Sequence, residues 1–114
     1  MGSWESHLLA GEAEPQRTLA WSDEVFRIFG YEPGQVQPGT EHFYRAVHPE
    51  DRDRIRQAVQ EAIRLGRPYE LDHRILLPDG SERVVHEQAE MQYEPGTGRP
   101  AKLVGTVRCG KKPV

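Results

Sequence analysis

The sequence predicts one α+β domain, built as a five-stranded antiparallel sheet with its helices packed on one face. A chain of 114 residues is long enough for one hydrophobic core. Apolar residues recur at helical spacing in the middle of the chain but alternate with polar residues toward both ends. The last three alternating segments are separated only by turns, so they are expected to pair as antiparallel neighbours, with the helices on the apolar face of the sheet.

Two short strands and a helix are expected in the first third of the chain. Alternation predicts strands over Ser3 to Leu9 and over Thr18 to Trp21. Ser22 has a side chain that can cap a helix, and two acidic residues follow it, where the helix dipole favours them. Gly30 is placed to end this helix after about two turns.

Two further helices are expected before the strands resume. Thr40 is a candidate cap for a short helix that extends to Val47. Pro49 fits the first position of a longer helix, because the N–H that proline lacks is not needed there. Apolar residues then recur at helical spacing until Gly66, so this helix is predicted over about 49 to 65.

The last part of the chain has the period of strands. Tyr69 to Leu77 alternates, with one mostly apolar side, and Pro78-Asp79-Gly80 has the residues of a hairpin turn. The returning strand is predicted over Ser81 to Tyr93 and a final strand over Lys102 to Cys109. Glu87 interrupts the apolar side of the returning strand, which indicates a bulge, an edge or a functional site.

Composition argues against several classes of partner. The 15 Lys and Arg residues and 18 Asp and Glu residues give a net charge of −3, without the broad positive field that binds nucleic acid. No apolar run approaches the roughly 20 residues of a membrane span and no signal peptide opens the chain, so no membrane contact is expected. The single cysteine, Cys109, cannot form an internal disulfide, which fits a cytoplasmic location.

Four segments resemble the PAS sensor domains, in the PAS/PAC subfamily whose last strands form the PAC region. They occur in the order of the family and agree with the strands and helices predicted above. The segments are the first helix at 21–31, the start of the long helix at 48–52 (His-Pro-Glu-Asp-Arg), the central hairpin at 69–75 with 78–80, and the last strand at 103–107. The resemblance implies the same five-stranded sheet with helices on one face.

The resemblance also implies a function. A single PAS sensory domain would occupy residues 1–114, with its core at about 3–109 and a flexible tail at 110–114. Such a domain binds a small ligand or a partner, forms a homodimer through PAS–PAS contacts and regulates an effector domain that this chain does not contain. The effector would be a histidine kinase, a cyclase or a transcription regulator, and the isolated domain would not be an enzyme.

Aromatic and aliphatic side chains between the helices and the sheet are candidate ligand contacts. These side chains either line a pocket or fill the space, and the sequence leaves both open. For the one histidine among them, a core residue hydrogen-bonded to a carbonyl or carboxylate is the favoured interpretation. The candidates are Trp21, Phe26, Phe29, Phe43, Tyr44, Ile55, Val59, Ile63, Leu71, His73 and Ile75.

We expect the domain to bind no cofactor, although flavin or another heterocycle is compatible with an aromatic pocket. The chain lacks the Asn-Cys-Arg motif of light-sensing relatives. Haem is not expected, because residues 50–65 contain no histidine and His48 is expected to close the start of the long helix. No metal site is expected either. His86, Gln88 and Glu90 share one side of a strand without a third strong ligand, which favours a polar row facing solvent or a partner.

A structural dimerisation module with a filled core is one alternative. In that case Trp4, Leu8 and the exposed face of the sheet would contact the partner.

A small enzyme is the other alternative. Asp72 or Glu87 would act with His73 or His86 as acid and base. The alternation places Asp72 on the polar face, away from His73, so a catalytic arrangement is not expected.

Overall fold

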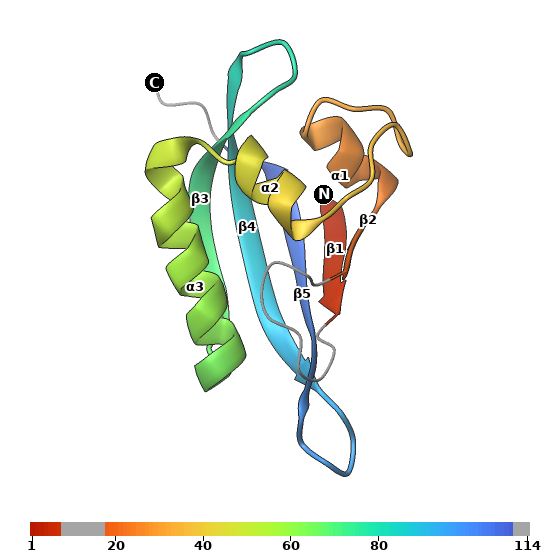
Figure 1. Ribbon diagram of the computed structural model, residues 1–114, viewed down its shortest axis with the longest axis vertical. Coiled ribbons are helices and arrows are strands. Elements are labelled where there is room, and N and C mark those ends of the chain that lie inside the picture. The colour runs from red at the N-terminus through yellow and green to blue at the C-terminus, as the bar shows by residue number, and fades with distance from the viewer. Residues whose placement is uncertain (8–17, 111–114) are drawn as a thin grey trace.

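A computed structural model describes residues 1–7 and 18–110 of the chain (Figure 1). Leu8, Leu9 and the predicted tail at 111–114 lie outside these residues. None of the described helices is both long and apolar enough to span a membrane. The elements are β1 (Gly2–His7), β2 (Thr18–Trp21), α1 (Asp23–Ile28), α2 (Thr40–Ala46), the 3-10 helix η1 (Pro49–Asp51), α3 (Arg52–Leu65), β3 (Tyr69–Leu76), β4 (Glu82–Tyr93) and β5 (Pro100–Cys109).

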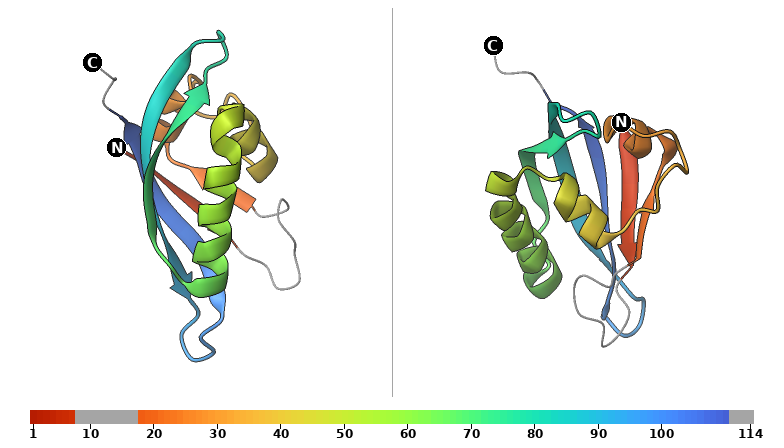
Figure 2. Two further views of the ribbon diagram at one scale, coloured as in Figure 1. Left: turned by 90° about the vertical axis from the view of Figure 1, so that its left-hand side faces the viewer. Right: turned by 45° about the horizontal axis from the view of Figure 1, so that its top comes forward.

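The strands form one five-stranded sheet in the order β2-β1-β5-β4-β3, with every neighbouring pair antiparallel. Because β2 and β3 lie at opposite edges, the helical segment between them has to cross the sheet. Figure 2 shows that all the helices lie on the same face. The predicted α+β class and the five-stranded antiparallel sheet are therefore confirmed.

The core lies between this face of the sheet and the helices. Trp4 belongs to it with 9% of its surface exposed, so the expectation that Trp4 contacts a partner is wrong. Its indole covers Gly105, the opposite residue on β5, where a Cβ atom would lie 2.5 Å from an indole carbon. The other buried apolar residues are Val25, Phe26, Ile28, Phe29, Val47, Ile55, Val59, Ala62, Ile75, Val85, Ala89, Met91, Leu103 and Val107.

Two of the predicted helix caps need correction. Ser22 occupies the cap position of α1, but its Oγ accepts a hydrogen bond from the Ser3 N–H of β1 at 3.0 Å and makes none to its own helix. Ser22 also donates its N–H to the Ser3 carbonyl at 2.9 Å, so pairing between segments takes the place of capping. Thr40 is the first residue of α2, and Gly39 holds the cap position. Gly30 ends α1 as predicted, with a φ of 89°.

The tail was predicted to begin at residue 110. Gly110 instead donates its N–H to the Val84 carbonyl at 2.8 Å, so the contact with β4 continues one residue further.

The start of the long helix is tied to β3. His48 closes it as predicted, because its Nδ1 accepts a hydrogen bond from the Glu50 N–H at 3.1 Å. The buried Asp51 carboxylate accepts three hydrogen bonds from Arg74: from the backbone N–H at 2.8 Å, from Nε at 3.1 Å and from Nη2 at 3.0 Å. These bonds hold the pKa of Asp51 well below its ordinary value.

Asp51→Asn is expected to destabilise the domain by about 1 kcal/mol, since part of the Arg74 guanidinium lies in screening solvent. Because the pKa of Asp51 is lower in the folded state, the wild-type advantage exists above the ordinary value of 3.8 and is lost as the pH falls. Urea unfolding at pH 7 and at pH 3 measures both effects. Asp53→Asn is the control, because that side chain is 99% exposed and its loss should change stability little at either pH.

Candidate functional site

A small cavity of about 40 Å3 lies between the sheet and the helices. All five strands and the three α-helices contribute side chains to its lining. Five of the predicted ligand contacts are among these side chains: Trp21, Phe29, Phe43, Tyr44 and Val59. The inward faces of elements far apart in the sequence therefore meet at one place.

The other predicted ligand contacts do not line the cavity. Ile55 precedes Val59 by one turn of α3, so it covers a different part of the sheet and is fully buried there. The remaining five are also parts of the core or packed against it, and as ligand contacts all six stay a prediction. They are Phe26, Ile63, Leu71, His73 and Ile75.

Eight of the described lining residues were not among the predicted ligand contacts, and six of these eight lie on strands. Alternation along the first strand already placed Trp4 and Ser6 on the same side. It did not indicate that this side faces the helices, because neighbouring positions on both sides include polar and apolar residues. The lining residues that were missed are Trp4, Ser6, Leu19, Val25, Thr40, Tyr69, Glu87 and Leu103.

Aromatic rings from β2, α2 and the segment of α1 with the following Phe29 contact one another at the cavity, and we call them the aromatic wall. Trp21 stacks on Phe29, with ring centres 4.8 Å apart, and meets Phe26 edge-on at 5.3 Å. Phe43 lies 6.2 Å from Phe29 and 5.3 Å from Tyr44. Arg56 of α3 places its guanidinium 5.0 Å from the centre of the Tyr44 ring.

Glu87 is a buried carboxylate on β4, with 2% of its surface exposed. It pairs in regular register with Leu71 and Val107, and the only irregularity of the strand lies at Gln92 and Tyr93. The break in the apolar pattern therefore marks an inward-facing acid rather than a bulge or an edge. Its presence in the cavity wall makes it the main polar group available to a ligand.

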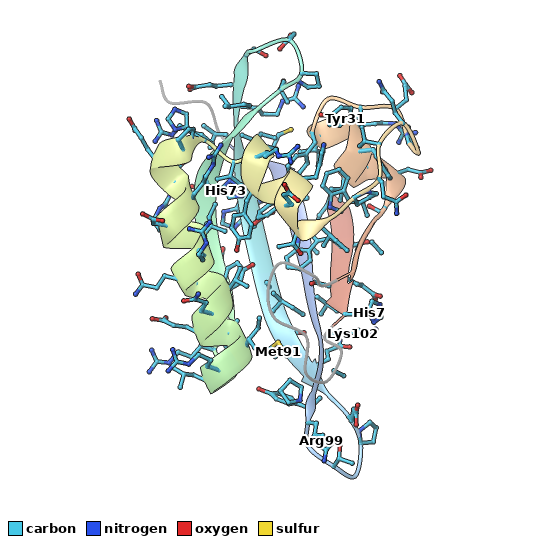
Figure 3. The ribbon with its side chains drawn as sticks, in the orientation of Figure 1. His7, Tyr31, His73, Met91, Arg99 and Lys102 are labelled. Carbon is cyan, nitrogen blue, oxygen red and sulfur yellow. The ribbon has the colours of Figure 1, made fainter. Side chains whose placement is uncertain are left out.

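His73, on β3 (Figure 3), lies beside Glu87. Its Nδ1 is 3.3 Å from the Arg74 carbonyl oxygen, so the predicted core histidine bonded to a carbonyl is confirmed. The Nε2 atom lies 3.2 Å from Glu87 Oε2, which is close enough for an ion pair. The contact does not have hydrogen-bond geometry, so among the described residues neither Nε2 nor Oε2 has a hydrogen-bond partner.

Two further polar atoms in the cavity wall lack partners within the described part of the chain. They are Ser6 Oγ and Trp4 Nε1, both buried. Buried polar groups in folded proteins are nearly always hydrogen-bonded, if not to protein then to water or a ligand. Unpartnered atoms around one cavity indicate a site that a polar molecule completes.

The opposite face of the sheet carries a second histidine cluster. His86 on β4 lies between two carboxylates of β3, with Nδ1 2.6 Å from Asp72 Oδ1 and Nε2 2.8 Å from Glu70 Oε1. The hydrogen bond to Asp72 is the main cause of the raised pKa of His86. Asp72 is on the outer face, away from His73, as the alternation predicted. No group of three or more His, Cys, Asp and Glu side chains among the described residues is placed to hold a metal ion.

Because its pKa is raised in the folded state, His86 should stabilise the domain below its ordinary value of 6.5, and this stabilisation should disappear as the pH rises through the raised value. NMR titration of the imidazole Hε1 measures the pKa directly. Asp72→Asn should lower it, whereas Glu90→Gln on the same face should leave it nearly unchanged. Equal titration of His86 in all three proteins would contradict the assignment.

The fold corresponds to that of known proteins. Residues 18–107 match the family model described as PAS fold. Among curated proteins, the probable diguanylate cyclase DgcE of Escherichia coli (strain K12) is 24% identical over 99 residues, which are 81% of this chain and 8% of that protein. The chain thus spans less than a tenth of the length of this relative.

Two solved structures share the fold. The sensory box histidine kinase/response regulator from Burkholderia thailandensis E264 has a TM-score of 0.74 and 22% identity, over 95% of this chain and 75% of that one. The N-terminal domain of a diguanylate cyclase with PAS/PAC sensor from Marinobacter aquaeolei has a TM-score of 0.76 and 18% identity, over 95% and 93%.

The proteins that the chain resembles in sequence or in fold therefore include diguanylate cyclases and a histidine kinase/response regulator. PAS domains are generally sensory, non-catalytic modules, often part of multidomain effector proteins, and they often dimerise. The family model matches most of this chain, from β2 to β5. The chain belongs to the PAS fold family.

Proposed function

We propose that the chain is a sensory module that binds a small ligand in the cavity between its sheet and helices and thereby regulates an effector domain. The observation that carries this proposal is the cavity itself, with the buried Glu87 in its wall. Every strand and every α-helix contributes to the lining, so a bound molecule contacts both layers of the domain at once. A ligand with different affinity for two arrangements of these layers shifts the balance between them.

The residues do not fit flavin or haem. A volume of about 40 Å3 is far below the roughly 300 Å3 or more of ordinary cofactor pockets. The only cysteine, Cys109, is exposed at the end of β5, and α3 carries no histidine. We therefore propose a ligand much smaller than either cofactor.

The relatives support the choice of effector. We place the module upstream of a histidine kinase or a diguanylate cyclase, the classes named for its relatives. In this proposal the chain is not itself an enzyme, works in the cytoplasm and forms a homodimer through PAS–PAS contacts. Analytical ultracentrifugation tests the dimer, and a monomer at every concentration would exclude it.

The alternative, a dimerisation module with a filled core, is less consistent with the cavity wall. A core that is only structural has no use for Glu87 Oε2 and Ser6 Oγ, which are buried without hydrogen-bond partners among the described residues. Filling the space with apolar side chains would be the more stable solution.

A cavity-filling variant tests the proposal. Val59→Phe adds a ring inside the cavity, while Gln60→Phe adds the same ring at the next, exposed position of α3. The wild type and the Gln60 variant, denatured after purification, should release a small molecule that mass spectrometry detects, whereas the Val59 variant should not. In the longer protein that carries the effector, Val59→Phe should fix the output at one level. No released molecule together with an unchanged output would overturn the proposal.

A further inference from the structure

We propose that the ligand of this cavity is a small protonated amine, bound through the Glu87 carboxylate inside a ring of aromatic side chains. This inference rests on the proposed function, because it names the chemical class of the ligand for the same site. It follows from the charge, the rings and the size of the cavity.

The charge of the wall selects a cation. Among the described residues that line the cavity, Glu87 is the only acidic one, and none is Lys, Arg or His. An anionic ligand such as a carboxylate or a phosphate would meet the Glu87 carboxylate with no positive side chain in the described lining to offset it. A buried carboxylate is itself costly unless it is paired.

His73 meets this requirement only in part. Its Nε2 lies 3.2 Å from Glu87 Oε2, close enough for an ion pair, but the contact lacks hydrogen-bond geometry and His73 is not among the residues that line the cavity. Glu87 Oε2 therefore has no hydrogen-bond donor among the described residues. An ammonium group carries a full positive charge and up to three hydrogen-bond donors, so it can supply the donor that Glu87 Oε2 does not find among the described residues.

The aromatic wall strengthens the case for a cation. Ring faces attract positive charge, and cages of aromatic side chains are the usual sites for ammonium groups. One ring of this wall already contacts a cation, since the Arg56 guanidinium lies 5.0 Å from the Tyr44 ring centre. The aromatic residues that line the cavity are Trp4, Trp21, Phe29, Phe43, Tyr44 and Tyr69.

The volume limits the size of the amine. The cavity measures about 40 Å3, and one water molecule needs about 10 to 15 Å3. There is room for about three or four non-hydrogen atoms, as in ethylammonium. Ser6 Oγ is a second buried acceptor in the wall for the donors of the amine.

Three probes of nearly equal size separate the possible chemistries: ethylammonium, ethanol and acetate. Titration of the 15N-labelled chain with each gives dissociation constants and shows which amides shift. Ethylammonium should bind with shifts around the cavity, ethanol should bind about tenfold more weakly or worse, and acetate should not bind. Glu87→Gln should weaken ethylammonium by about ten- to a hundredfold.

Glu90→Gln is the matched control, because it makes the same chemical change on the outer face of the same strand. Its affinity for ethylammonium should equal that of the wild type. The two amide variants also report whether any loss comes from misfolding, since their 15N spectra away from the cavity should remain like the wild type.

The outcomes separate this inference from the proposed function. Equal binding of ethanol and ethylammonium, or binding that Glu87→Gln leaves unchanged, would overturn the amine and leave a sensory cavity. A second result would also overturn the amine and leave a sensory cavity: none of the three probes binds, but the wild type still releases a molecule that Val59→Phe does not release. Failure of all three probes, with nothing released by any variant and an output that Val59→Phe leaves unchanged, would overturn both.

Discussion

His73→Leu alone should destabilise the domain by about 3 to 5 kcal/mol, because it leaves the Glu87 carboxylate buried without its nearest partner. Both side chains are 2% exposed, so water cannot take over the lost contact. Glu87→Leu alone should cost less, about 1 to 3 kcal/mol, since an imidazole without a partner is cheaper to bury than a carboxylate.

The double variant, with leucine at both positions, should be about as stable as the wild type or more stable. Two apolar side chains of similar size fill the space of the pair without any desolvated charge. Urea unfolding of the four proteins gives the coupling free energy of the cycle. The same cycle on His86 and Asp72, which belong to the same two strands but face solvent, should give a much smaller coupling.

Additive effects of the two core substitutions would show that His73 and Glu87 do not act as a pair. If the coupling is strong and the double variant is at least as stable as the wild type, the natural pair contributes no more to the free energy of unfolding than an apolar pair does. A costly polar pair beside a cavity is more consistent with a role in ligand binding than with a role in stability.

Phe29→Ala should destabilise the domain by about 3 to 5 kcal/mol. Phe29 is 2% exposed, stacks on Trp21 and has its ring centre 6.2 Å from that of Phe43. Its removal would join a ring-sized space to the existing cavity. Benzene should then raise the melting temperature of the variant and leave the wild type unchanged, because an apolar cavity of ring size binds benzene.

Tyr93→Ala is the control for this prediction, because it also removes an aromatic ring but at a position that is 48% exposed. Its effect should be much smaller, and benzene should not alter it. A small loss for Phe29→Ala, together with no effect of benzene, would mean that the neighbouring rings collapse into the space.

Local signals in the sequence were sufficient for most elements of the fold. The long helix and the following hairpin were predictable, because the apolar period changes between them and Pro49, Gly66 and the turn at 78–80 mark their ends. Ser22 shows where such signals fail. Its position as a cap was predictable, but its side chain binds Ser3, a residue that only the folded sheet brings near.

The candidate site was less predictable for the same reason. The period of two identified Glu87 as an exception and placed His73 on the apolar side of its strand. That they meet depends on the register, which pairs Leu71 with Glu87 and His73 with Val85 and so makes the two residues diagonal neighbours. The cavity is the space left after all the layers have packed, and no single segment encodes it.

The contact between Trp4 and Gly105 restricts how this protein can evolve. A side chain at 105 would collide with the indole and with the Gln88 carbonyl, so a single substitution there damages the sheet. A larger residue at 105 requires a smaller one at 4, and among homologues the two positions should covary. Because Trp4 also lines the cavity, each such exchange would reshape the proposed ligand site. Paired substitutions at positions 4 and 105 that preserve the sheet would therefore also change which ligands fit the proposed site.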